Sequence, residues 1–352
     1  MTSLFFIGDT MRTATEIRQS VTKEIAESLK RGIAPWRQSW QSGNPHQANF
    51  LSKRSYHGIN SIILMITARQ NGLDSRFWGS ADSWEKVMGA KVIDGNKPTL
   101  ITYFSLVPTK DKFGNIIKTK TGKPKMSPLM RAFEVFNACQ VAPLSPSKLM
   151  EIYKTKRKLL NFAKTLLGKR VLERIRNYSF ENLASELSVK LMEKLHKVRN
   201  DSPLISFVPK LKMASELIKN INADIIHGTF DPAYYPKEDV IRMPHQALFT
   251  SEEEYYQTLF HELMHWSESE IRNGKPDTPY AFNELVAEIG SCFMMLELNI
   301  PMSEKMMEST QSYVSDWISH MDRDPKFIFD AASKASKNVD FLLNMVKQKQ
   351  AV

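Results

Sequence analysis

The chain has 352 residues, of which 42% are hydrophobic, and its formal net charge is +10 at pH 7. This length accommodates two domains with buried cores, and the positive charge favours a polyanionic partner. Its two cysteines, Cys139 and Cys292, lie far apart in apolar surroundings, which excludes a cysteine-based zinc cluster and suits a reducing compartment. No apolar run reaches the length of a membrane span, and residues 1–7 lack the basic start of a signal peptide. We therefore expect a cytoplasmic protein without a membrane partner.

The beginning of the chain predicts a disordered end followed by helices. Residues 1–12 precede the patterned sequence, and we expect them to be disordered. Residues 13–32 carry apolar side chains at helical spacing and end in glycine, which predicts an amphipathic helix. A second, more apolar helix is predicted at residues 61–70.

Two strand-like runs follow, at residues 99–106 and 132–136, on either side of a basic, turn-rich hairpin at 110–125. Aromatic and basic residues alternate throughout this first part of the chain. Such a composition suits single-stranded nucleic acid, where bases stack on rings and cations follow the phosphates. It equally suits a small domain whose Trp and Tyr side chains form the core, so both interpretations stay open.

A basic helical segment lies in the middle of the chain. Residues 141–147 form a linker rich in Pro and Ser, and residues 148–200 favour helix and contain 14 Lys and Arg against 5 Glu. This segment looks like an insertion. It predicts either a solvated helix face or an added phosphate-binding arm.

The most informative segment is the helix predicted around residues 255–266. Leu259, Leu263 and Trp266 lie at three- and four-residue steps and form an apolar stripe. His261 and His265 share another face, where two imidazoles four residues apart can hold one Zn²⁺ while Glu262 reaches a metal-bound water. The plain alternative is a pair of polar residues on a half-exposed helix.

A second helix, predicted from Asn283 to Leu298, supplies further carboxylates. Glu284 follows His265 by 19 residues, the ligand spacing of zincins whose third ligand is glutamate, and three protein ligands leave a position for water. Asn283 and Glu288 are expected to lie behind the ligands and support them, with Glu288 accepting the other N–H of a ligand histidine. Tyr280, one turn before Glu284, is a candidate oxyanion donor, although a core tyrosine is the commoner role. The expected metal is Zn²⁺, with Mn²⁺ as an alternative.

The predicted helix that carries His261 and His265 is preceded by strand-like sequence. Residues 223–228 predict a strand and turn, and residues 239–244 predict an edge strand. In zincins an edge strand beside the metal aligns an extended peptide by backbone pairing.

Residues 13–140 resemble the N-terminal single-stranded-DNA-binding domain of ArdC-type antirestriction proteins, a domain shared with TraC-type plasmid primases. The resemblance rests on the motifs Pro35-Trp36-x-x-x-Trp40, Asn49, Tyr56-x-Gly58-Ile59-Asn60, Phe77-Trp78, Val87–Ala90 before Lys91, and Arg131–Asn137. Residues 92–97 depart from it, because relatives carry a more basic turn there. The DNA-binding residues that the resemblance implies are Trp36, Arg37, Trp40, Asn49, Lys53, Arg54, Tyr56, Asn60, Trp78, Lys91 and Arg131.

The remainder of the chain, from about residue 211, resembles the ArdC metallopeptidase-like domain. The motifs are Phe260-His261-Glu262-Leu263-x-His265-Trp266 and Tyr280-x-x-x-Glu284-Leu285-Val286-Ala287-Glu288. If the site hydrolyses peptides, Glu262 takes the proton from the water and hands it to the leaving amine. The expected fold is α+β: disordered residues 1–12, a DNA-binding domain at 13–140, a linker and basic helical insertion at 141–210, and a zincin-like domain at 211–352.

The resemblance implies an antirestriction protein of a plasmid or phage that binds single-stranded DNA and protects incoming DNA in the host cytoplasm. The metal site would act on a host protein, such as a component of the restriction system. One alternative is a non-catalytic DNA-binding protein whose metal is structural. Another, a nucleic-acid enzyme, lacks a Gly-x-x-x-x-Gly-Lys phosphate loop and has only the isolated acidic pair Asp322-x-Asp324 to support it.

Overall fold

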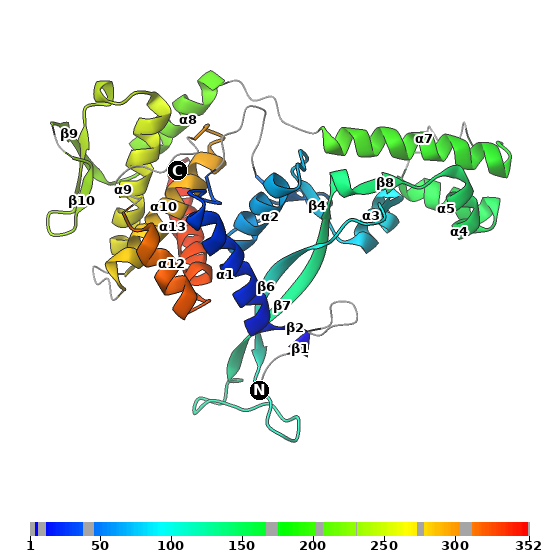
Figure 1. Cartoon of the computed structure of the whole chain (residues 1–352), viewed down its shortest axis with the longest axis horizontal. Coiled ribbons are helices and arrows are strands. Elements are labelled where there is room, and N and C mark those ends of the chain that lie inside the picture. Colours follow the sequence, from blue (N-terminus) through cyan, green and yellow to red (C-terminus); the bar gives the residue numbers. More distant parts are fainter. Residues whose placement is uncertain are drawn as a thin grey trace. The chain divides into compact units, whose positions relative to one another are not determined.

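The computed structural model describes residues 4–5, 12–37, 46–166, 175, 177–200, 207–229, 231–272, 278–302 and 312–350 (Figure 1). It contains both helices and sheets, which confirms the α+β expectation. Contacts divide the chain into two units. The first unit comprises residues 1–17, 48–54 and 67–201, and the second comprises residues 18–47, 55–66 and 202–352. Each unit is therefore assembled from segments that are far apart in sequence. The four domain ranges that we predicted from the sequence, 1–12, 13–140, 141–210 and 211–352, stay predictions.

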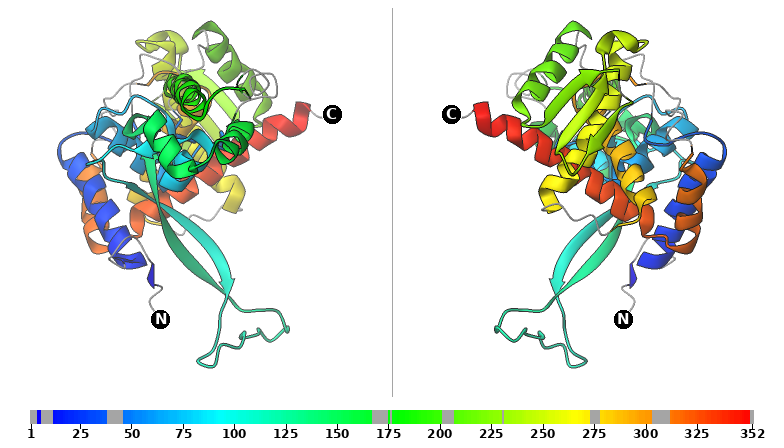
Figure 2. Two further views of the ribbon diagram at one scale, coloured as in Figure 1. Left: turned by 90° about the vertical axis from the view of Figure 1, so that its right-hand side faces the viewer. Right: turned by 90° about the vertical axis from the view of Figure 1, so that its left-hand side faces the viewer.

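The first unit is built on a four-stranded sheet in the order β3 (Ala48–Asn49), β4 (Phe77–Gly79), β7 (Met126–Asn137) and β6 (Thr99–Pro108). Two smaller antiparallel pairs join β5 (Ala90–Val92) with β8 (Val141–Pro143), and β1 (Leu4–Phe5) with β2 (Arg12–Thr13). Strands β6 and β7 form a long ribbon that leaves the rest of this unit, as Figure 2 shows.

Helix α3 (Ala81–Met88) packs against strands β5 and β7 of the first unit. Ser80 caps its first turn, and Gly89 ends it in the left-handed conformation with φ of 56°. The buried indole of Trp84 stacks on Phe50, with ring centroids 3.8 Å apart. Gly89 also permits close packing, because a Cβ there would lie 2.7 Å from a methyl carbon of Leu191.

The basic helical segment folds as part of the first unit. It forms α4 (Pro146–Tyr153), α5 (Lys156–Leu166) and α7 (Phe180–Arg199), and a short 3-10 turn, η1 (Ala138–Gln140), precedes it. Its apolar side chains are buried together: Leu149, Leu159, Leu183, Leu187 and Leu191. Arg199 donates from Nε to the carbonyl of Ala138 at 2.9 Å, which ties the end of α7 to η1. The segment is thus packed core on one side and basic surface on the other.

The second unit is mainly helical. Its helices are α1 (Ala14–Lys30), α2 (Ile59–Gln70), α8 (Phe207–Asn220), α9 (Glu252–Arg272), α10 (Tyr280–Glu297), α12 (Val314–Arg323) and α13 (Phe327–Gln350), of which the first residues of α1 and the end of α2 are counted with the first unit. Helix α10 is buried almost throughout and packs on α9 and α13. No helix in the described ranges is long and apolar enough to cross a membrane.

Helices α9 and α10 approach closely at Gly290. A Cβ added at this glycine would lie 2.4 Å from the sulfur of Met264 and 2.7 Å from its Cγ. Both positions are buried, so the missing side chain lets the two helices meet side by side. This contact brings together the two helices on which the candidate ligands lie.

A small sheet lies beside α9 in the order β10 (Ala233–Tyr235), β11 (Val240–Pro244), β9 (Asp224–Gly228), and the 3-10 turn η2 (Gln246–Leu248) follows it. The prediction of an edge strand at 239–244 was wrong. Strand β11 pairs on both sides, antiparallel with β10 and parallel with β9, and its side chains Val240, Ile241 and Met243 are buried. The edge beside α9 belongs to β10 instead.

Candidate metal centre

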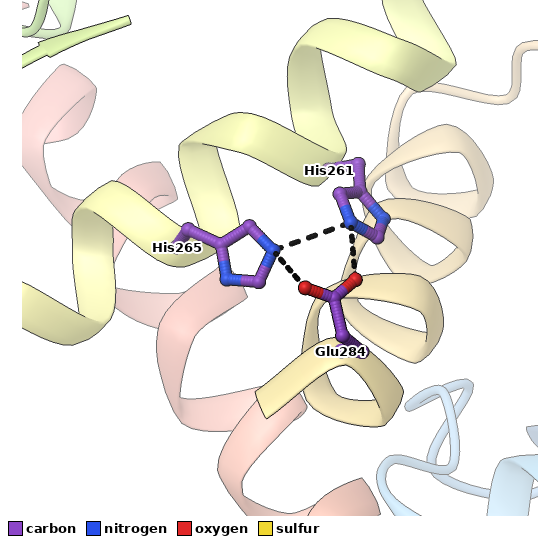
Figure 3. A group of neighbouring side chains, drawn as sticks. All are labelled: His261, His265 and Glu284. Atoms are coloured by element: carbon purple, nitrogen blue, oxygen red, sulfur yellow. Dashed lines mark hydrogen bonds and ion pairs between the residues drawn. The ribbon is translucent and has the colours of Figure 1, made fainter. Parts of the chain in front are cut away.

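Two adjacent helices bring three candidate ligands together. His261 and His265 lie one turn apart on α9, and Glu284 lies in the first part of α10 (Figure 3). The Nε2 atoms of the two histidines are 3.3 Å apart. Glu284 Oε2 lies 3.4 Å from His261 Nε2, and its Oε1 lies 3.5 Å from His265 Nε2. The three side chains therefore direct one donor atom each toward a common point.

This arrangement fits a divalent metal ion. Two imidazoles and a carboxylate form an established donor set for catalytic zinc, and a tetrahedral ion with bonds of about 2.0–2.1 Å holds its ligands about 3.3–3.4 Å apart. The observed separations of the donor atoms agree with that spacing. Within the described residues this is the one group of three or more His, Cys, Asp or Glu side chains found close enough to share an ion.

The charges of the site favour one cationic species at its centre. Burial lowers the pKa of His265 to about 4, and the neighbouring His261 contributes to the same shift. Burial also opposes charge on His261, but the hydrogen bond to Glu284 and the surrounding carboxylates outweigh it and raise the pKa. Burial raises the pKa of Glu284, while the two histidines counteract it and leave the pKa below its ordinary value. One proton or one metal ion satisfies this set.

Glu262 is held next to the candidate ligands by the edge strand. The backbone N–H of Tyr234, on β10, donates to Glu262 Oε2 at 2.9 Å. Burial raises the pKa of Glu262, although the His261 charge and the Tyr234 N–H both act against that rise. A buried carboxylate with a raised pKa, fixed at one oxygen, can accept a proton at the other. Sequence reasoning missed the role of Tyr234, because a backbone donor leaves no residue-type signal.

Glu288 has different partners from those expected. Its carboxylate accepts two hydrogen bonds from Arg37, from Nε at 2.5 Å and from Nη2 at 2.9 Å, and a third from Trp36 Nε1 at 3.2 Å. Among the described residues, His261 Nδ1 is buried without a hydrogen-bond partner. Glu288 therefore anchors residues 36–37 instead of orienting a ligand histidine directly.

The other two residues predicted around the site are also placed. Asn283 Oδ1 accepts a hydrogen bond from the hydroxyl of Thr278 at 2.6 Å, next to the start of α10. Tyr280 is 66% exposed. Partial burial and hydrogen bonds to Tyr313 and Glu284 raise the pKa of Tyr280, so its hydroxyl remains protonated beside the candidate ligand.

The predicted DNA-binding residues are distributed over both units. Trp36 and Arg37 are buried in the second unit and Trp78 in the first, so in this conformation their side chains cannot touch DNA. Their burial reflects packing: Trp36 meets Trp317 at 6.2 Å between ring centroids. Trp40 lies outside the described residues. The exposed members of the predicted set are Lys53, Arg54, Lys91 and Arg131.

Three half-buried residues complete the predicted DNA-binding set: Asn49, Tyr56 and Asn60. The side-chain oxygen of Asn49 accepts the backbone N–H groups of Leu51 and Ser52, at 3.0 and 2.9 Å, and so shapes the turn after β3. The backbone N–H of Tyr56 donates to the carbonyl of Gln47 at 2.8 Å. A DNA contact by any of these residues stays a prediction.

The fold and the candidate site are those of a zincin-like domain combined with a second, sheet-based domain. Residues 212–334 match the family model described as zincin-like metallopeptidase, and residues 15–136 match the model of the N-terminal domain of anti-restriction factor ArdC. The two matches together cover most of the chain and lie in the order expected for an ArdC-type protein.

Solved structures of the ArdC protein from the R388 plasmid share this fold. The metal-free structure matches with a TM-score of 0.64 and 25% identity, over 95% of this chain and 98% of that one. The Mn(II)-bound structure matches with a TM-score of 0.61 and 24% identity, over 94% and 98%.

Longer proteins contain related sequence. The chain is 26% identical to a DNA primase TraC of Escherichia coli over 357 residues, which covers 99% of this chain and 21% of the primase. A second E. coli TraC primase is 28% identical over 94% of this chain and 27% of its own length. The uncharacterized protein y4eC of Sinorhizobium fredii is 22% identical over 95% and 93%. The chain thus spans about a quarter or less of the TraC primases that it matches.

Proposed function

We propose that this chain is an antirestriction protein that binds single-stranded DNA and hydrolyses peptide bonds at a divalent-metal site. The observation that carries the hydrolytic part is the convergence of His261, His265 and Glu284, with Glu262 fixed beside them by Tyr234. The DNA-binding part is supported by the ArdC-type N-terminal domain and by the basic surface of the chain.

In this mechanism His261, His265 and Glu284 hold the metal, which supplies Lewis-acid polarisation of a carbonyl and of water when bound. Glu262 accepts the proton from the attacking water and returns it to the leaving amine. Tyr234 keeps the Glu262 carboxylate in place through its backbone N–H. Tyr280, protonated and exposed at the start of α10, donates a hydrogen bond to the developing oxyanion.

The hydrolytic proposal is tested by metal content and turnover. Wild type should contain about one divalent ion per chain by elemental mass spectrometry, and His261→Ala/His265→Ala should contain none; the analysis distinguishes Zn²⁺ from Mn²⁺. Glu262→Gln should retain the ion, but its rate of hydrolysis of an unfolded, fluorescently labelled protein should fall by about a hundred-fold or more. Glu252→Gln, an exposed change at the start of the same helix, is the matched control.

The outcomes separate the proposal from its alternative. If Glu262→Gln leaves every activity unaltered while metal removal unfolds the protein, the ion is structural and the chain is a binding protein. Protection is measured as the survival of unmethylated plasmid DNA entering a restricting bacterial host, with and without the protein. Equal survival would contradict the antirestriction role.

A further inference from the structure

The ribbon of β6 and β7 consists of two strands alone over most of its length. Its strands pair from Thr99↔Val135 to Pro108↔Met126, a length of about 30 Å. Strand β4 pairs only with residues 136–137 of β7, and β6 is the other edge of the sheet. Within the described part of the first unit, the outer ribbon is therefore covered by no third strand. Two strands alone are only marginally stable in water. A partner that binds the ribbon would explain why its side chains are exposed.

One face of the ribbon carries two exposed rings and a cation. Tyr103 is 58% exposed and Phe133 is 49% exposed, and their ring centroids are 6.5 Å apart in an edge-to-face arrangement. Arg131 is directly opposite Tyr103 in the register, and alternation along the strands places Phe133 on the same face. Arg131 is also exposed. The three side chains form an exposed aromatic and cationic cluster.

The end of the ribbon is strongly basic. Residues 109–125 contain one acid, Asp111, and six lysines: Lys110, Lys112, Lys118, Lys120, Lys123 and Lys125. In the described ranges none of these lysines forms an ion pair, whereas Lys112 lies over the ring of the exposed Phe113, 5.0 Å from its centroid. The Asp111 carboxylate instead caps the turn, accepting the backbone N–H groups of Phe113 and Asn115 at 2.8 and 2.9 Å. The positive charge is therefore available to a partner.

We propose that the β6–β7 ribbon is the platform for single-stranded DNA, with bases stacking on Tyr103 and Phe133 and the backbone following Arg131 and the lysines of residues 109–125. Ring faces are accessible only to unstacked bases, so the cluster favours a single strand, while lysines alone would bind any polyanion. The proposal rests on the proposed DNA-binding function and names the site responsible for it. It replaces the buried Trp36 and Trp78 with exposed rings as the stacking residues.

The test uses the full chain and a labelled single-stranded oligonucleotide of about 20 nucleotides. Fluorescence anisotropy measures the binding affinity across a salt series. Tyr103→Leu/Phe133→Leu keeps apolar side chains on the strands but removes the ring faces. We expect its affinity to fall by about five-fold or more for each ring, with an unchanged salt slope. Tyr178→Leu, which changes an exposed ring elsewhere in the first unit, should bind like wild type.

A second pair of variants tests the charge. Lys118→Gln/Lys120→Gln/Lys123→Gln should reduce the slope of log affinity against log salt by about 2, because each neutralised phosphate contact contributes about 0.7. The matched control, Lys158→Gln/Lys164→Gln/Lys197→Gln, removes exposed lysines from α5 and α7 and should leave the slope unchanged. Thermal unfolding of all variants checks that the fold is retained.

Several results would overturn the proposal. If the ribbon variants bind like wild type while the α5 and α7 variant loses salt dependence, the platform lies on the basic helical segment. If wild type binds a duplex as tightly as the single strand and the leucine variant is unaffected, ring stacking plays no part. If the ribbon variants change only the sedimentation of the protein, the ribbon is an interface between copies. Failure of wild type to bind the oligonucleotide would instead refute the DNA-binding function itself.

Discussion

Arg37 and Glu288, 251 positions apart in the chain, form a buried bidentate ion pair in the second unit. Their side chains are 1% and 0% exposed. Glu288 lies one turn after Glu284 on α10, so the arginine anchors the helix that carries the third candidate ligand. Residues 34–37, which lie within the match to the ArdC N-terminal domain, thus help to build the surroundings of the candidate metal centre.

Removing the cation alone should be costly. Arg37→Met would leave Glu288 buried and unpaired, which we expect to lower the free energy of unfolding by about 3–5 kcal/mol. Urea unfolding measures this change. Arg37→Met/Glu288→Leu should recover most of the loss because no buried charge remains. The control is Lys23→Met, which breaks an exposed ion pair with Glu27 at 3.9 Å. Equal stability of Arg37→Met and Lys23→Met would contradict the prediction.

Arg37→Met should also weaken metal binding, although Arg37 is not a candidate ligand. Changing a residue that supports a metal ligand lowers metal affinity by about 10- to 100-fold when the change disturbs the orientation of that ligand. Competition with a fluorescent chelator measures the affinity of the folded protein for Zn²⁺. An affinity equal to that of Lys23→Met would show that Glu284 is positioned without help from the ion pair.

The ion pair also predicts an acid dependence of stability. Burial raises the pKa of Glu288, but the charge and hydrogen bonds of Arg37, with the Trp36 N–H, outweigh it and lower the pKa below 4.5. A carboxylate with a lowered pKa in the folded state stabilises the fold above its unfolded pKa, and this contribution is lost as the pH falls through the folded pKa. Below about pH 4.5, metal-free wild type should lose stability more steeply than Arg37→Met/Glu288→Leu. Parallel curves would refute this assignment.

Tyr280 offers a test of its proposed part in catalysis. Tyr280→Phe removes the hydroxyl but keeps the ring, which contacts Tyr313 with centroids 5.6 Å apart. We expect kcat to fall by about ten-fold or more while metal content and KM change little, because the hydrogen bond forms to the oxyanion. Unchanged kcat would assign Tyr280 to packing at the start of α10.

Gly290 should tolerate no side chain. Gly290→Ala would place a methyl group against Met264, and overpacking of a buried helix contact costs about 1–3 kcal/mol. Urea unfolding measures the loss. Gly290→Ala/Met264→Ala should lose less than the sum of its single changes, since the shortened side chain makes room. Strict additivity would show that the helices separate freely.

Much of the candidate metal centre could be predicted from the sequence. The i, i+4 spacing of His261 and His265 determines that the two rings share a face of α9, because local helical geometry needs no tertiary information. The 19-residue spacing between His265 and Glu284 predicted the third candidate ligand through its likeness to zincins, and the structure brings all three side chains together. The aromatic and basic character of the ribbon was likewise visible in the composition.

Tertiary structure alone decided which polar and aromatic groups are used for packing. Trp36 and Arg37 carry the composition of a DNA-binding loop, yet they are buried because a carboxylate 251 positions away requires a partner inside an apolar helix bundle. Strand order, which placed β10 beside Glu262, also depends on long-range pairing that local periodicity cannot specify. The sequence by itself thus determined the candidate ligands and their spacing, whereas the fold decided their neighbours, because burial and pairing join segments that are remote in the chain.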